Sequence, residues 1–189
     1  AADCVTKIDR MHISGVYSVL DYSVEGKQNE AQFNFVVEKT LELIAFAAEN
    51  KAMPFAVFKP TAVGRFELYE KVSKSDILTP AENKEWEQIK TRFHTICKYA
   101  QKMKIAVLVD AEESWMQDSA DTLLLDLMKE YNKESVVVYN TIQAYRWNRL
   151  DYLKELNAIA KKENFKLGFK LVRGAYMEKE RKRAEFKNI

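Results

Sequence analysis

The chain has 189 residues, of which 47% are hydrophobic and 31% charged, with only 5 Gly and 3 Pro, and this composition excludes a disordered or collagen-like protein. The length is enough for one domain with a sizeable core. The 30 basic and 28 acidic residues give a formal net charge of +2, which argues against a nucleic-acid partner.

Five short runs of Val, Ile, Leu and Phe recur along the chain. They cover residues 15–22, 54–60, 105–113, 135–143 and 166–174. Each run is nearly continuous in apolar residues, which is typical of a strand that is covered on both faces in a parallel sheet.

Longer amphipathic segments separate these runs, and their apolar residues recur at helical spacing. Thr79 before Pro80 predicts a helix start, with threonine as the N-cap and proline at the first helical position. The segment 64–79 adds a short amphipathic piece of its own. The four predicted stripes are Phe33, Val36, Thr40, Leu41, Ile44 and Ala48; Trp86, Ile89, Phe93, Ile96, Cys97 and Ala100; Ala120, Leu124, Leu127 and Tyr131; and Leu150, Leu153, Leu156 and Ala160.

Polar residues stand at or just past the end of every predicted strand. Five βα units in series fit either an open doubly wound sheet or part of an eight-stranded barrel. A barrel would bring these strand ends together on one rim, whereas an open sheet would scatter several of them, so we favour the α/β (βα)8 barrel. The residues are Asp21 and Glu25, Lys59, Asp110 with Glu112 and Glu113, Asn140 and Gln143, and Lys170 and Arg173.

A complete barrel needs at least about 200 residues and eight strands, whereas this sequence supplies about five βα units. We therefore expect a single domain over residues 1–189, which forms an incomplete barrel whose remaining strands and final helix lie beyond this chain.

The segment KLVRGAY, residues 170–176, places two cations and a glycine at a strand-to-helix turn. Lys170, Arg173 and Gly174, followed by the positive end of a helix, would suit the pyrophosphate of a cofactor. The alternative is a strand end with cations that reach solvent. The sequence contains neither G-x-G-x-x-G nor G-x-x-x-x-G-K-[ST], so neither nucleotide-binding fingerprint applies.

Three carboxylates, Asp110, Glu112 and Glu113, follow the third predicted strand. They could bind a divalent metal, act as a general base, or orient cations on neighbouring strands. We favour the last role, with Asp110 as the partner of Lys59 and Lys170, because a cation held in a barrel mouth needs a counter-charge. With only two histidines in the chain, we expect no metal site.

Asn140 and Gln143 end the fourth predicted strand. An amide can read the edge of a heterocycle, or it can simply cap the strand by bonding to a loop backbone. Lys59, before Pro60, could anchor a substrate carboxylate, form a Schiff base, or lie in solvent. The sequence shows no Ser-His-Asp arrangement and no Cys-x-x-Cys, which favours a cofactor as the carrier of the reaction.

Five segments carry a resemblance to the proline dehydrogenase family. LDYSVEG, FKPTAVGRFELYEK, VLVDAEESWMQ, YNTIQAY and KLVRGAYMEKERKRA occur in this order and at the family's spacing. The resemblance implies a distorted (βα)8 barrel that binds FAD at its C-terminal rim. It also implies oxidation of L-proline to Δ1-pyrroline-5-carboxylate, with electrons passed to a membrane quinone.

The resemblance also implies roles at the substrate. Lys59 would contact the proline carboxylate, and Asp110 would belong to the acidic cluster beside substrate and flavin. Leu171 and Tyr176 would line the proline pocket, and Glu25 would pair with a substrate-binding arginine. The family's last helix, which supplies a tyrosine and two arginines to the carboxylate, is not matched by any segment of this chain.

Other residues would hold the cofactor. Gln143 would hydrogen-bond the flavin ring, and Val172 would make a main-chain contact. Lys170 stands where the family usually has an arginine, so it keeps the charge but loses the bidentate fork. Arg173 stands at a position often held by lysine, and Gly174 would allow close approach of the cofactor.

Location and partners follow from these expectations. Cys4 and Cys97 lie far apart, which favours reduced thiols, and no apolar run reaches the ~18 residues that cross a bilayer. We expect L-proline and a quinone as partners and no nucleic acid. The location would be the cytoplasm, peripheral to the inner membrane, in a bacterium, or the matrix side of the mitochondrial inner membrane in a eukaryote.

Two rival functions remain open at this point. One is a Schiff-base aldolase that uses Lys59 or Lys170. The other is an interaction module without catalytic activity, in which no ligand would occupy the rim. The oligomeric state has no signal in the sequence.

Overall fold

The computed structural model describes residues 2–22 and 29–188, and its centre is a sheet of five parallel strands. The strands are β1 (Val19–Asp21), β2 (Phe55–Phe58), β3 (Ala106–Val109), β4 (Val138–Gln143) and β5 (Phe169–Val172). All five predicted strands are therefore confirmed. Each is shorter than the run that predicted it, because the polar and turn-forming residues at the ends of the runs lie outside the ladder.

The strands follow one another in space in the order of the sequence, β1-β2-β3-β4-β5. Neighbours pair in parallel without a crossover, for example with Val57 opposite Leu108 and Ile142 opposite Leu171. A doubly wound sheet would reverse direction at a switch point, whereas consecutive order is what an arc of a (βα)8 barrel requires. The predicted fold class is thus confirmed.

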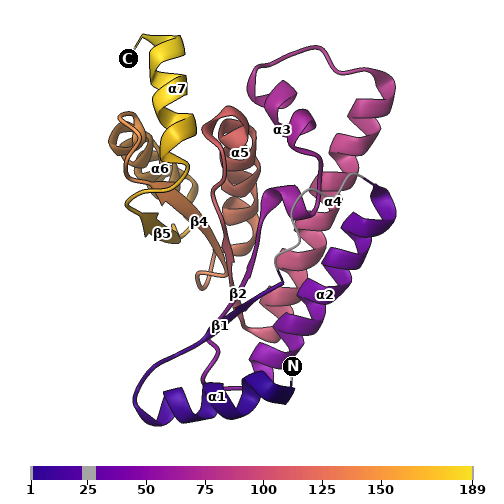
Figure 1. Ribbon diagram of the computed structural model, residues 1–189, viewed down its shortest axis with the longest axis vertical. Helices are drawn as coiled ribbons and strands as arrows, with labels where there is room; N and C mark the ends of the chain where they lie inside the picture. Colours follow the sequence, from indigo (N-terminus) through magenta and orange to yellow (C-terminus); the bar gives the residue numbers. More distant parts are fainter. Residues whose placement is uncertain (1, 23–28, 189) are drawn as a thin grey trace.

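Helices cover the outer face of the sheet, and Figure 1 shows α1 at the foot of the strands and α7 at the opposite end. The helices between them connect successive strands. The bounds are α1 (Ala2–Ile13), α2 (Glu30–Glu49), the 3₁₀ turn η1 (Pro60–Ala62), α3 (Phe66–Ser73), α4 (Pro80–Met103), α5 (Ser114–Tyr131), α6 (Arg149–Glu163) and α7 (Met177–Lys187).

The start of α4 is set by a capping box. The Thr79 hydroxyl accepts a hydrogen bond from the backbone N–H of Glu82 at 3.2 Å, and the Glu82 carboxylate accepts one from the backbone N–H of Thr79 at 2.9 Å. Pro80 occupies the first helical position, where its missing N–H costs nothing. The predicted helix start is confirmed.

The core lies between the outer face of the sheet and the helices. Phe58 of β2 packs edge-on against Phe93 of α4, with ring centroids 5.1 Å apart, and Val107 and Val109 of β3 are fully buried. Most of the predicted apolar stripes are confirmed. Two stripe residues are errors: Ala48 is exposed near the end of α2, and Leu150 is 64% exposed while α6 turns the neighbouring Arg149 inward.

The concave face of the sheet, away from these helices, carries the alternate residues of each strand. Phe55 of β2 and Tyr139 of β4 meet there across β3, with ring centroids 5.6 Å apart. Thr141 shares this face and lies opposite Lys170 in the ladder. Side chains at the C-terminal ends of the strands therefore converge above the concave face.

Two further predictions concern the chain as a whole. Both cysteines are free thiols, Cys97 buried in α4 and Cys4 exposed on α1. Within residues 2–22 and 29–188, no helix is both long and apolar enough to span a membrane.

Candidate active site

Lys170 and Asp110 form an ion pair at the C-terminal end of the sheet. Lys170 lies on β5 and Asp110 directly follows β3, so their side chains meet above β4. The Lys170 ammonium donates to Asp110 Oδ1, and the two side chains are 33% and 25% exposed. The predicted pairing of Asp110 with Lys170 is present, and the barrel-like order of the strands brings the two residues together.

Glu112 ties the loop after β3 to the turn after β2. Its buried carboxylate accepts hydrogen bonds from the backbone N–H of Thr61 at 2.9 Å and from the Thr61 hydroxyl at 2.7 Å. Thr61 lies in η1, two residues after Lys59. Two strand ends that carry predicted site residues are therefore joined by one carboxylate.

The three acidic residues after β3 have different partners. Asp110 holds Lys170, Glu112 holds Thr61, and Glu113 accepts an ion pair from Lys179 of α7. Among the residues with described positions, no cluster of three His, Cys, Asp or Glu side chains has the geometry of a metal site. Each of the three carboxylates therefore orients a cation or a loop, which is the role that we favoured from the sequence.

Gln143, the last residue of β4, is buried and bonded at both ends of its amide. Its Nε2 donates to the carbonyl oxygen of Glu112 at 2.5 Å, and its Oε1 accepts from Arg146 Nη1 at 3.1 Å. One of these bonds goes to a loop backbone, so the amide caps the strand, which was one of the two roles considered from the sequence. The side chain of Tyr145 also interacts with this amide.

Arg146 is a site residue that sequence reasoning missed. The whole residue is 5% exposed, and burial lowers the pKa of its guanidinium, an effect that the nearby charge of Arg149 reinforces. The signal that could have found it is its position three residues after Gln143, in a turn where the backbone N–H of Arg146 bonds to the Gln143 carbonyl at 3.0 Å.

The end of β5 and the turn that leads to α7 hold four further predicted residues. Arg173 and Gly174 are exposed, Val172 and Tyr176 half-buried. Tyr176 adopts a left-handed conformation, with φ of 53°, at the start of α7, which is uncommon for a residue with a bulky side chain. A Cβ at Gly174 would meet only Met177 Sδ, at 3.9 Å, so packing within the described chain does not require glycine there.

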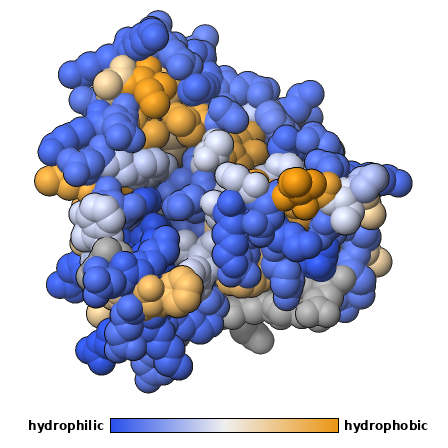
Figure 2. Space-filling model, turned by 90° about the horizontal axis from the view of Figure 1, so that it is seen from above, coloured by the Kyte–Doolittle hydropathy of each residue, from blue (hydrophilic) through white to orange (hydrophobic). Residues whose placement is uncertain are grey.

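The remaining predicted residues are more exposed to solvent than Gln143 and Glu112. Lys59 is half-buried between β2 and η1. Leu171 of β5 is 66% exposed, and strand alternation places it on the face opposite Lys170. Glu25 lies outside the described residues. Figure 2 looks onto this end of the molecule, whose surface is largely hydrophilic with separate apolar patches.

The side chains at this end fit a phosphorylated flavin cofactor. Lys170, Arg173, Arg146 and the buried Arg183 of α7 concentrate positive charge beside the β4 and β5 ends. Within the described residues, the buried Nε atoms of Arg146 and Arg183 have no hydrogen-bond partner. Cations suit the pyrophosphate and amides suit the edge of a heterocycle, so the donor set is appropriate for FAD.

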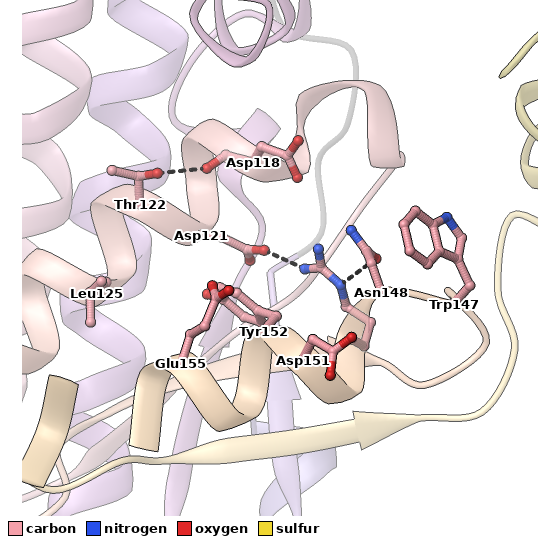
Figure 3. Close-up of a pocket in the computed structure, with 10 residues that line it drawn as sticks. Asp118, Asp121, Thr122, Leu125, Trp147, Asn148, Asp151, Tyr152 and Glu155 are labelled. Carbon is pink, nitrogen blue, oxygen red and sulfur yellow. Dashed lines mark hydrogen bonds and ion pairs between the residues drawn. The ribbon is translucent and has the colours of Figure 1, made fainter. Parts of the chain in front are cut away.

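A separate cleft of about 490 Å³ lies between α5 and α6 on the helical layer (Figure 3). Its floor is an ion pair in which Arg149 donates to Asp121 at 2.7 Å. Burial raises the pKa of Asp121, opposed by hydrogen bonds from Asn140 and Gln117. None of the predicted site residues lines this cleft, so it is distinct from the strand-end site.

Comparison with known proteins gives a consistent result. The family model described as proline dehydrogenase matches residues 4–189. A carbapenem antibiotics biosynthesis protein, CarD, of Pectobacterium carotovorum subsp. carotovorum is 40% identical over 169 residues, 89% of this chain and 45% of that protein. Mitochondrial proline dehydrogenase 1 of Dictyostelium discoideum is 28% identical, over 94% of this chain and 38% of its own length.

Among solved structures, proline utilization A from Bdellovibrio bacteriovorus, inactivated by N-propargylglycine, superposes with a TM-score of 0.76 at 16% identity. The match covers 96% of this chain and 20% of that one. At this identity the likeness shows the fold. This chain spans less than half the length of the two curated relatives.

Proposed function

The chain belongs to the proline dehydrogenase family, and from that premise we propose that it supplies part of a barrel that oxidises L-proline to Δ1-pyrroline-5-carboxylate with FAD. The observation that carries the proposal is the Lys170–Asp110 ion pair above β4, together with the bond from the Gln143 amide to the carbonyl of Glu112, two residues after Asp110. Three family motifs, distant in the sequence, thereby meet at one end of one sheet.

The proposed reaction needs little chemistry from the side chains. FAD, when bound, supplies a hydride acceptor for the ring carbon next to the proline nitrogen. The protein must bind proline as the neutral amine, neutralise its carboxylate, and hold the reacting carbon against the cofactor. These tasks call for cations and apolar walls rather than a nucleophile.

In this proposal the residues divide into two groups. Lys59 binds the proline carboxylate, Asp110 fixes the cation of β5, and Tyr176 contributes apolar surface. Leu171 lies on the face of the sheet opposite Lys170, so the proposal leaves it out of the pocket. Glu25 pairs with a substrate-binding arginine. A second group holds FAD: Gln143, Lys170, Val172, Arg173 and Gly174.

The Schiff-base alternative has less support. Lys170 donates to Asp110, and an ammonium engaged in this way has no lone pair for attack on a carbonyl. Lys59 lies beside Pro60 in the turn after β2, where it is half-buried. Retention of borohydride-trapped pyruvate on Lys59 would favour the aldolase over the dehydrogenase.

A second candidate role is biosynthetic. The relative with 40% identity is named for carbapenem antibiotic biosynthesis, so the same oxidation of a cyclic amino acid could serve antibiotic formation instead of proline breakdown. Deletion of the gene would distinguish the two, because a catabolic role predicts loss of growth on proline as nitrogen source. A biosynthetic role predicts loss of the antibiotic with growth on proline intact.

The proposed electron acceptor is a membrane quinone, reached by peripheral contact with the bilayer. The protein would then act at the cytoplasmic side of the inner membrane in a bacterium, or at the matrix side in a mitochondrion. The Dictyostelium relative is named as a mitochondrial protein. The test is proline-dependent reduction of a soluble quinone by the complete protein, with Δ1-pyrroline-5-carboxylate as product. Quinone reduction without that product would reject the proposal.

A further inference from the structure

We propose that the exposed face of α6, which runs from Leu150 to Lys162, is a dimer interface. Two copies of this protein meet there across a twofold axis, with their α6 helices antiparallel. In this arrangement Lys161 and Lys162 of each copy lie against the acidic cleft between α5 and α6 of the other. The interface belongs to the helical layer and not to the strand-end site, so it does not depend on the proposed chemistry.

Two large apolar side chains are exposed at the start of α6. Trp147, in the turn before the helix, is 72% exposed, and Leu150, in its first turn, is 64% exposed. Figure 3 shows the Trp147 indole standing apart from the other side chains that line the cleft. Single exposed apolar residues are ordinary on a protein surface, whereas contiguous ones are characteristic of interaction sites.

The cleft beside these residues carries an excess of negative charge. Four carboxylates and one guanidinium line it, so its formal net charge is −3. Arg149 is already bound to Asp121 at 2.7 Å, and the excess is therefore carried by Asp118, Asp151 and Glu155. A partner that fits this cleft must bring cations.

The opposite end of the same helix supplies such cations. Lys161 and Lys162 are exposed in the last turn of α6, whereas Asp151 is exposed in its first turn. Acidic residues at a helix start and basic residues at its end suit the helix dipole. The same distribution also makes α6 complementary in charge to an antiparallel copy of itself, so the partner that fits best is a second copy of this chain.

The spacing of charges along α6 sets the register of the two helices. Asp151 and Lys161 are equally distant in sequence from Leu156, so helices centred at that level place Asp151 of one copy beside Lys161 of the other. The exposed residues next to this centre, Asn157 and Ala158, are small and uncharged, which allows the helices to approach closely. The twofold axis repeats every contact, so the interface closes on itself and gives a dimer instead of a filament.

The same register covers the exposed apolar residues. Leu150 lies level with Lys162 of the second copy, whose methylene chain can pack on it while the ammonium reaches the cleft. The Trp147 indole, three residues earlier, offers an aromatic face to the same cations. A helix of 15 residues buries less surface than a standard interface. We therefore expect a dimer that dissociates on dilution.

The experiment measures the mass of the complete protein by analytical ultracentrifugation at roughly 1 to 100 µM. Asp151→Lys and Lys161→Asp are compared with the unaltered protein, which should form a dimer as its concentration rises. Each single variant should raise the dimer dissociation constant at least ~10-fold, because it places like charges side by side at two symmetric positions. The double variant should restore the dimer, because it exchanges the charges and rebuilds both pairs.

Trp147→Ser and Ile77→Ser are a matched pair, because each removes one exposed apolar side chain. Ile77 is 96% exposed on the connection between α3 and α4, on the other side of the molecule from α6 (Figure 1). Trp147→Ser should weaken the dimer at least ~10-fold, as for an aromatic residue at the heart of an interface, and Ile77→Ser should leave it unchanged. The thermal midpoint of each variant checks that its fold is intact.

A monomer at every concentration, a dimer that both charge reversals leave intact, or a double variant that stays dissociated would overturn the inference. A monomer whose Trp147 fluorescence is shielded from acrylamide would overturn it as well, by showing that another segment of the complete protein covers this face. The measurement requires neither FAD nor proline, so its outcome is independent of the proposed function.

Discussion

Lys170 donates to Asp110 from two strands away, so one ion pair reaches across β4 from β5 to the end of β3. The consecutive strand order places these two strand ends on either side of β4. The Gln143 amide at the end of β4 bonds the carbonyl of Glu112, two residues after Asp110. The ion pair is the strongest single link between the fold and the proposed chemistry.

Asp110→Asn should impair the site more than the fold. Both side chains of the pair are partly exposed, so the free energy of unfolding should fall by less than ~1 kcal/mol. Affinity for FAD and turnover of proline should each fall at least ~10-fold, because Lys170 loses its fixed position. Lys170→Arg is the control that keeps the charge, and it should retain activity. Equal losses in stability and in cofactor binding would refute this role.

Lys59→Ala should act on the substrate and spare the cofactor. We expect the KM for proline to rise ~10- to 100-fold, as for loss of a charged hydrogen bond, with the Kd of FAD unchanged. Lys59→Arg should recover part of the loss. Steady-state kinetics and a flavin titration measure the two quantities separately, and a parallel loss of both would show that Lys59 serves another purpose.

The capping box of α4 predicts a dependence of stability on pH. Hydrogen bonds from Lys71 and Thr79 lower the pKa of Glu82 to about 2 in the folded state, from its ordinary value near 4.5 in the unfolded chain. Because the folded pKa is depressed, the stabilisation is complete above pH 4.5 and disappears as the pH falls toward 2. Glu82→Gln should be less stable than wild type at pH 6, and the difference should vanish near pH 2. A constant difference across this range in urea titrations would contradict the assignment.

Gly168→Ala should destabilise the sheet at the start of β5. An added Cβ would lie 2.5 Å from Val136 Cγ1 and 2.8 Å from the Val138 carbonyl oxygen. The backbone cannot yield easily, since the Gly168 carbonyl accepts a bond from Asn140 N–H at 3.0 Å. We expect a loss of ~1–3 kcal/mol in thermal or chemical unfolding. Gly174→Ala, where the nearest atom is 3.9 Å away, is the matched control and should leave the stability of the apoprotein near wild type.

Sequence patterns predicted the strands and their convergence because both depend on local features. An apolar run defines a buried strand, and the polar residue after it must lie at the strand end. The Lys170–Asp110 pair followed from that reasoning. Apolar spacing alone failed at Leu150, because the first turn of α6 buries Arg149 against Asp121 instead.

The supporting bonds could not be predicted, because each joins residues that are distant in the chain and unremarkable in sequence. Thr61 and Glu112 are 51 residues apart, and Gln143 and Glu112 are 31 apart. The sequence around Thr61 and around Glu112 does not indicate that these two residues bond to each other. Only the folded sheet shows which of the acidic residues binds a cation and which binds a loop.

The most direct test of the central claim is the visible absorption spectrum of the complete purified protein, recorded without oxygen before and after addition of L-proline. We predict flavin bands near ~450 nm that bleach when proline is added, because a flavin that accepts the hydride loses this absorption. A protein that stays colourless after incubation with FAD, or flavin bands that proline leaves unchanged, would contradict the account.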